Sequence, residues 1–279
     1  MSARWLSVPA SVACLVLALW LSASVVLAAP VTSKCLAVAE NLSPDFQVTY
    51  RRAATVENKA GLANNEVRVT FVGHSTFLIE SPKGVVAATD YAGWHGRGRA
   101  PDIVTMNHAH DSHYTDTPDP EIAHVLRGWG EKKGSYAAHN VTVADMYVRS
   151  VPTNIRDWSG GTEEFGNSVF IFEVSGLCIG HLGHLHHELT PQQLGQIGQL
   201  DVVMVAIDGV FTLDFGGVQN VLKELRARIV LPMHFFGDLD GFDSVIRETH
   251  DIEISESRSV VLSPATMPKK PKMLVLKGY

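Results

Sequence analysis

The 279-residue chain has few charged residues and only three cysteines. Charged side chains make up 19% of it, and 29 acidic residues against 23 basic ones give a formal charge of −6. This shortage of positive charge argues against nucleic acid as a partner, because affinity for phosphates depends on basic side chains. Hydrophobic residues make up 46% of the chain, enough to bury a core, so bulk disorder is excluded.

No long apolar run follows the first 29 residues. Within them, Arg4 precedes an apolar run over 15–27, and Val26-Leu27-Ala28 has the short side chains of a cleavage site. This pattern predicts a signal peptide over 1–28 and a mature domain over 29–279. The alternative is an uncleaved anchor, although the run is shorter than the roughly 20 residues of a membrane span. We expect a periplasmic or secreted protein without stable membrane association after cleavage.

The cysteines bear on whether the protein is exported. Cys14 leaves with the predicted signal peptide, so Cys35 and Cys178 remain. An even pair in an exported protein favours a disulfide. The alternative is two separate thiols, one of them buried in a strand.

Short β-rich runs alternate with a few helical patterns. The alternation of apolar and polar residues over 67–72 is typical of a half-buried strand. Asp119 before Pro120 predicts a helix over 120–127, and Thr190-Pro191 predicts another through Ile197. Ser175-Gly176 predicts a hairpin turn. Periodicity by itself indicates a mixed α/β class, with a further helix over 218–225 and further strands over 76–80, 85–89, 103–106, 141–148, 168–174, 177–179, 201–207, 229–231, 260–262 and 273–276.

Thirteen histidines is a high count, and their spacing is informative. His108, His110 and His113 follow the predicted strand over 103–106. On extended backbone a His-x-His pair places both rings on one face, and a turn brings the third toward them. Neutral imidazole is a common ligand of zinc and related ions. Three histidines at this spacing therefore favour a metal site over unrelated surface or core histidines.

Two other segments add histidines at strand ends. Four lie within 181–187, where His184 follows Gly183, and His234 follows the strand over 229–231. Ligands from several strand ends can meet at one edge of a fold.

Taken in order, these segments resemble the metallo-β-lactamase superfamily, in its lactonase-like and phospholipase-D-like branch. Residues 71–80 are similar to the opening signature of that branch, and Thr89-Asp90 to the end of its next strand. Residues 108–113 correspond to the His-x-His-x-Asp-His ligand motif, and Pro232-Met233-His234 to the segment of the last ligand. The resemblance runs from about Val67 to His234. It implies an αββα sandwich of two mixed β-sheets with helices on the outer faces, and a metal-dependent hydrolase.

The chain also departs from that pattern. Ser112 stands where the motif has Asp, and His184 where the family has a bridging Asp. The histidine expected before the Gly-Asn-Ser segment has no counterpart over 151–157. Bridging carboxylates offset the repulsion between two nearby cations, so their loss favours one ion over two.

We therefore expect a metal site formed by His108, His110, His113, His184 and His234. Nitrogen ligands favour zinc, with iron or another transition metal left open, over Mg²⁺ or Ca²⁺. Hydroxide formed on the metal would attack an ester, lactone or phosphodiester in a small-molecule substrate. Catalytic candidates are Asp111, Asp208 and His74. The alternative is a degenerate member that binds metal or ligand without turnover, and the oligomeric state stays open.

Overall fold

The computed structural model describes residues 33–36 and 61–278, except 133, 158 and 238. The predicted signal peptide lies outside these residues, as do its proposed cleavage site and Cys14. Within the described part of the chain, no helix is long and apolar enough to cross a membrane.

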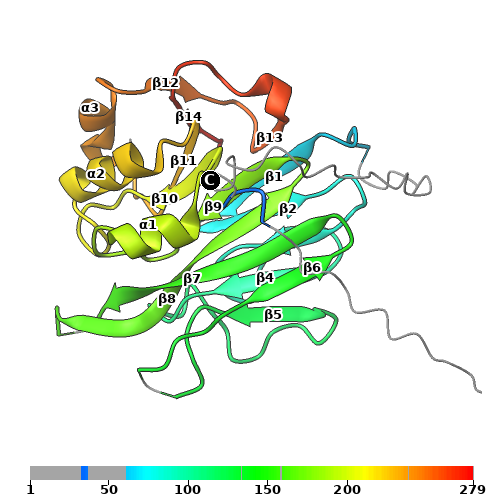
Figure 1. Cartoon of the computed structure of the whole chain (residues 1–279), viewed down its shortest axis with the longest axis horizontal. Coiled ribbons are helices and arrows are strands. Elements are labelled where there is room, and N and C mark those ends of the chain that lie inside the picture. The colour runs from blue at the N-terminus through cyan, green and yellow to red at the C-terminus, as the bar shows by residue number, and fades with distance from the viewer. Residues whose placement is uncertain (1–32, 37–60, 133, 158, 238, 279) are drawn as a thin grey trace, which may run out of the picture. The chain divides into compact units, whose positions relative to one another are not determined.

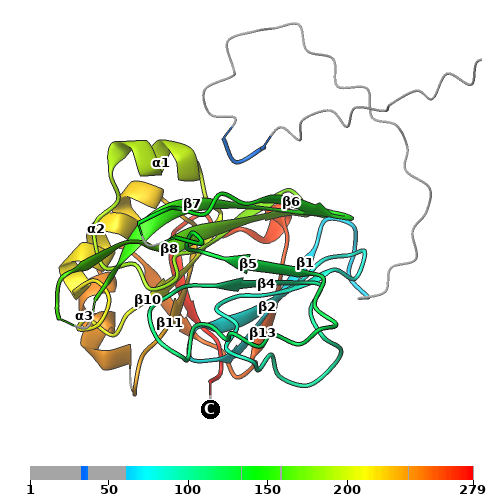
Figure 2. The ribbon, with the colours of Figure 1, turned by 90° about the horizontal axis from the view of Figure 1, so that it is seen from below.

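Two mixed β-sheets form the framework. One sheet has six strands in the order β13-β1-β2-β3-β4-β5, and the other has eight in the order β12-β14-β11-β10-β9-β8-β7-β6. Figure 2 shows β6, β7 and β8 in one layer and β4 and β5 in the other. The six-stranded sheet consists of β1 (Val67–Gly73), β2 (Thr76–Glu80), β3 (Val86–Ala88), β4 (Ile103–Met106), β5 (His124–Arg127) and β13 (Ser259–Leu262). The eight-stranded sheet consists of β6 (Asn140–Val143), β7 (Met146–Arg156), β8 (Thr162–Val174), β9 (Leu177–His181), β10 (Val202–Ala206), β11 (Ile229–Met233), β12 (Asp251–Ile254) and β14 (Lys272–Val275).

Alternation along the strands explains the layers. On β10, Val202 and Met204 point to a core between the sheets, where they share a cluster with Phe77 of β2. Val203 and Val205 point the other way, into a second cluster with the helices. Strand residues buried on both faces fit a sheet covered on both sides. The eight-stranded sheet therefore lies between the six-stranded sheet and the helices.

Three helices pack against the second face of that sheet. They are α1 (Pro191–Ile197), α2 (Phe215–Leu225) and α3 (Phe242–Ile246), and they lie together beside β10 and β11 (Figure 1). Thr190 caps α1 in a capping box with Gln193, and Asp214 caps α2 by accepting the N–H of Gly217. A third, smaller cluster around Tyr91 and Met106 covers the outer face of the six-stranded sheet.

Most predicted elements are present, and the αββα sandwich is confirmed in its two mixed sheets. The helix predicted over 120–127 is wrong, because residues 124–127 of this segment pair with β4 as the parallel strand β5. The strand predicted over 141–148 is two strands, β6 and β7, separated by a turn at Ala144-Asp145. Ala144 has a φ of 48° there, and because a left-handed conformation is uncommon for alanine, the sequence did not predict this turn.

The predicted disulfide is present. Cys35 is bonded to Cys178 of β9 across a sequence separation of 143 residues. The carbonyl of Cys35 also accepts the N–H of Gln199, and the N–H of Lys34 is bound by Glu173 of β8. The bond and these contacts hold residues 33–36 against the eight-stranded sheet.

Candidate metal centre

The candidate centre lies where several strands end. His74 follows β1, the segment with His110 and His113 follows β4, His184 follows β9, and His234 follows β11. The carbonyl of His74 accepts the N–H of His234 at 2.8 Å, so two distant segments are joined directly at the site. His74 and His234 have φ values of 53° and 54°. Such strained backbone persists where the surrounding structure requires it, and it is frequent at functional sites.

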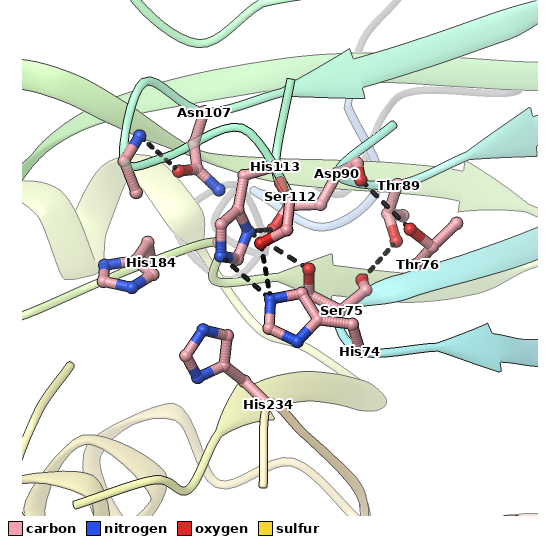
Figure 3. Close-up of polar contacts among 12 residues, drawn as sticks. His74, Ser75, Thr76, Thr89, Asp90, Asn107, Ser112, His113, His184 and His234 are labelled. Carbon is pink, nitrogen blue, oxygen red and sulfur yellow. Dashed lines mark hydrogen bonds and ion pairs between the residues drawn. The ribbon is translucent and has the colours of Figure 1, made fainter. Parts of the chain in front are cut away.

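Four imidazoles converge. One ring nitrogen from each of His74, His110, His113 and His234 lies within 4.8 Å of the others. The ring of His184 completes the group, with centroids 5.0 to 5.2 Å from those of His113, His234 and His110. Figure 3 shows the rings of His74, His113, His184 and His234 around a common space.

Two buried carboxylates orient two of these rings. Nδ1 of His113 lies 2.9 Å from Oδ2 of Asp90, and Nδ1 of His234 lies 3.0 Å from Oδ2 of Asp208. A ring that donates its Nδ1 proton to a carboxylate keeps the Nε2 lone pair for a cation. Hydrogen bonds from His234 and Thr212 outweigh burial and hold the pKa of Asp208 below its usual range. In that tautomer the Nε2 atoms of His113 and His234 are available to a cation.

The cluster also keeps its other rings neutral. Burial, followed by repulsion from His234 and His113, lowers the pKa of His74 to about 3. Burial and the rings of His113 and His234 lower the pKa of His110 to about 4. Neutral imidazole is the form that binds a metal. At neutral pH these side chains present lone pairs to the common space.

Several buried nitrogens have no hydrogen-bond partner. Among the described residues they include Nδ1 and Nε2 of His184 and Nε2 of His234 in the cluster, besides one side-chain nitrogen each of Asn107 and His186. A buried polar atom left unpaired costs about 1–3 kcal/mol, so such atoms require an explanation. A cation among the rings would satisfy those of the cluster, and an all-imidazole set suits a transition metal. The side chains present therefore fit a metal ion.

Serine and asparagine side chains support the arrangement. Oγ of Ser112 lies 2.9 Å from Nε2 of His74 and 2.8 Å from Nδ1 of His110, so it bridges the two rings. The side-chain oxygen of Asn167 accepts the N–H of His184, and its amide group donates to the carbonyl of Leu182. A Cβ at Gly183 would lie 2.1 Å from that oxygen, so this turn requires glycine. The sequence did not single out Asn167 as a residue of the centre; its only signal is its place in the Gly-Asn-Ser segment.

His108 lies outside the cluster, contrary to expectation. Its Nδ1 is 2.7 Å from Oε1 of Glu163, and its ring lies against Trp129 and Tyr114, with centroids 5.0 and 5.5 Å away. Strand β4 ends at Met106, so the residues after it form a loop and the alternation of a strand does not apply to them. His74 was expected as a catalytic residue, but its ring contributes one of the four converging nitrogens.

The two acids proposed for catalysis have different surroundings. The carboxylate of Asp208 is fully engaged, because it accepts three backbone N–H groups of 210–212 and the hydroxyl of Thr212 besides facing His234. Its hydrogen bonds therefore orient the ring of His234. Asp111 is exposed on the turn after His110 and lines a cavity of about 340 Å³ with it.

A family model described as a beta-lactamase superfamily domain matches residues 68–234, which is more than half of the chain. The chain belongs to the beta-lactamase superfamily. The resemblance noted from the motifs is thereby confirmed.

Named relatives of this superfamily member agree. A metal-dependent hydrolase of Methanosarcina barkeri is 24% identical over 195 residues, which cover 61% of this chain and 83% of the relative. One from Pyrococcus furiosus is 25% identical over 195 residues, covering 61% and 84%. A Thermotoga maritima structure, assigned as a Zn-dependent hydrolase of the metallo-beta-lactamase superfamily, has a TM-score of 0.54 and 24% identity, covering 76% of this chain and 100% of its own. The likeness to the Thermotoga maritima structure shows a shared fold.

Proposed function

We propose that this beta-lactamase superfamily member is a metal-dependent hydrolase with zinc as its ion, acting on an ester, lactone or phosphodiester. The observation that carries the proposal is the convergence of four ring nitrogens within 4.8 Å, two of them on rings oriented by buried carboxylates. The names of the curated relatives support the reaction class.

The ligands we propose are His74, His110, His113, His184 and His234. When bound, a divalent transition metal lowers the pKa of a water molecule and so supplies a nucleophile near neutral pH. Because Ser112 and His184 bring no negative charge to the centre, a single ion remains our expectation. Asp90 and Asp208 hold His113 and His234 in place through Nδ1.

Asp111 is the carboxylate we propose for proton transfer. It lines the same cavity as His110, and its side chain is exposed to that space. A carboxylate oxygen there can accept the proton of the attacking water and return it to the leaving group. Asp208 has no free oxygen for this role.

Metal analysis of the purified protein tests the site. We expect about one transition-metal ion per chain, as in sites with several imidazole ligands. His110→Ala should lose the ion, whereas His250→Ala, far along the chain, should keep it. Hydrolysis of p-nitrophenyl acetate or bis(p-nitrophenyl) phosphate should stop on chelation and return with zinc. A bound ion without any turnover would instead favour a non-catalytic metal-binding protein.

We also propose that the protein is exported to the periplasm or secreted. The disulfide between Cys35 and Cys178 supports this location, because such bonds persist in oxidising compartments. Fractionation of cells that express the full chain should find it outside the cytoplasm, shortened by about 28 residues at its N-terminus. A full-length cytoplasmic product would contradict the proposal.

A further inference from the structure

A recess leads from the surface to His110 and His184. It consists of a cavity of about 340 Å³ and a smaller one of about 80 Å³, and both are lined by Ala109, His110, Arg156 and Asp157. The smaller cavity also contacts His184 and Phe211. Because two proposed metal ligands form its wall, this recess is the substrate's route to the centre, an assignment that rests on the proposed function.

Arg156 is the only lysine or arginine among the described residues that line the recess. It is the last residue of β7, and its guanidinium lies 3.4 and 3.3 Å from the carbonyl oxygens of Phe211 and Thr212. Within the described part of the chain, no carboxylate lies at ion-pair distance from it. A guanidinium has five N–H donors, so two long bonds to neutral carbonyls leave donors for a further acceptor.

Two of the acidic residues that line the recess, Glu163 and Asp157, have other partners. Glu163 faces His108, and Oδ1 of Asp157 accepts the N–H groups of Ser159 and Gly161 at 2.8 Å each. Asp111 lines only the larger cavity. The smaller cavity is thus lined by one cationic side chain, that of the exposed Arg156.

A continuous set of contacts fixes this guanidinium relative to the centre. His234 faces Asp208, and Asp208 accepts the N–H groups of Val210, Phe211 and Thr212. The carbonyls of the last two residues then face Arg156. A proposed metal ligand and the cation are therefore held by the same loop. Phe211 of this loop is 56% exposed and adds an apolar wall beside the cation.

We propose that Arg156 is a specificity-determining residue that binds an oxyanion, a phosphate or carboxylate oxygen pair, on the substrate. Arginine is suited to this task because its planar fork matches two oxygens at once. The apolar part of the substrate lies against Phe211. Among the substrate classes considered above, this selects anionic ones, such as phosphodiesters or lactones and esters with a carboxylate or phosphate group.

Binding of phenylphosphonate, which combines an oxyanion with an apolar ring, tests the assignment. Calorimetric titration of the purified protein should show binding that Arg156→Met weakens at least about tenfold, as expected for loss of a charged hydrogen-bond pair. Arg156→Lys, which keeps the charge without the fork, should fall in between. Arg247→Met removes an exposed arginine paired with Asp243 and should leave the affinity unchanged. Equal affinity in Arg156→Met and the unaltered protein would overturn the proposal.

Kinetics provide a second, independent measurement. Arg156→Met should raise KM about tenfold for bis(p-nitrophenyl) phosphate while sparing kcat, and should affect p-nitrophenyl acetate hydrolysis much less. A metal content equal to that of the unaltered protein excludes damage to the centre. Equal losses on the anionic and the neutral substrate would contradict a role in anion binding. If neither substrate is hydrolysed, the hydrolase proposal fails, and the phosphonate titration still decides the role of Arg156.

Discussion

His184 is the site residue whose two ring nitrogens are both buried without a hydrogen-bond partner. Burial first, and then His113 and His234, lower its pKa to about 2, so the ring is neutral. We predict that His184→Leu lowers zinc affinity at least about tenfold. The metal-free variant should be no less stable than the metal-free parent, because leucine removes unpaired polar atoms. Thermal unfolding with zinc and with chelator measures both effects.

His108 provides the control for His184, because it is a histidine near the centre but outside the cluster. Its ring is held by Glu163 and by two aromatic rings rather than by the cluster. His108→Ala should therefore leave the metal content unchanged, as measured by elemental analysis. Loss of the ion from His108→Ala with retention in His184→Leu would show that the ligand set is that of the family motif.

At the scale of elements, the disulfide joins residues 33–36 to β9. Closing a loop of 143 residues restricts the unfolded chain, so the bond should contribute about 2–5 kcal/mol to the free energy of unfolding. The double variant Cys35→Ala, Cys178→Ala should lose this amount in urea unfolding and keep its metal. A reducing agent should produce the same loss in the parent and none in the variant. A reducing agent without effect on the parent would show that the bond contributes nothing.

Elements whose ends are defined by residues with strong local preferences could be predicted from the sequence. The turn at Ser175-Gly176 and the helix after Thr190-Pro191 follow from residue types with strong local preferences. The segment 120–127 could not, because its pairing with β4 outweighs the cap that Asp119 suggests. For the same reason the orientation of His108 depends on where β4 ends and on Glu163, which is 55 residues away.

At the scale of the whole molecule, the motifs and their order were enough for the family and the fold. Most of the histidines of the centre could also be found, because strand ends meet at one edge. Their carboxylate partners could not be assigned, because Asp208 was expected in catalysis and Asp90 was noted only as part of a motif. Asp208 joins His234 across 26 residues and Asp90 joins His113 across 23, contacts that only tertiary packing creates. The same holds for Arg156, whose segment was noted only for lacking a histidine.

The stability of the whole fold should depend on pH through histidines whose pKa is lowered in the folded protein. Burial lowers the pKa of His250, and the positive charge of Lys270 lowers it further. Burial also lowers the pKa of His181, because it outweighs the attraction of the Asp90 carboxylate. Nε2 of His181 donates to the carbonyl of Ser75 and its Nδ1 accepts the N–H of Gly183, so protonation would break a bond.

Below pH 6.5 the unfolded chain therefore binds more protons at these histidines than the folded chain, and the free energy of unfolding falls as the pH falls. We predict lower stability at pH 5.5 than at pH 7.5 in urea unfolding with a chelator present, so that metal binding adds no pH dependence of its own. Carboxylates do not account for a loss in this window, because their ordinary pKa lies well below it. His250→Gln should reduce the loss. A free energy of unfolding that is constant or rises toward pH 5.5 would show that these rings take up protons in the folded protein, which their surroundings argue against.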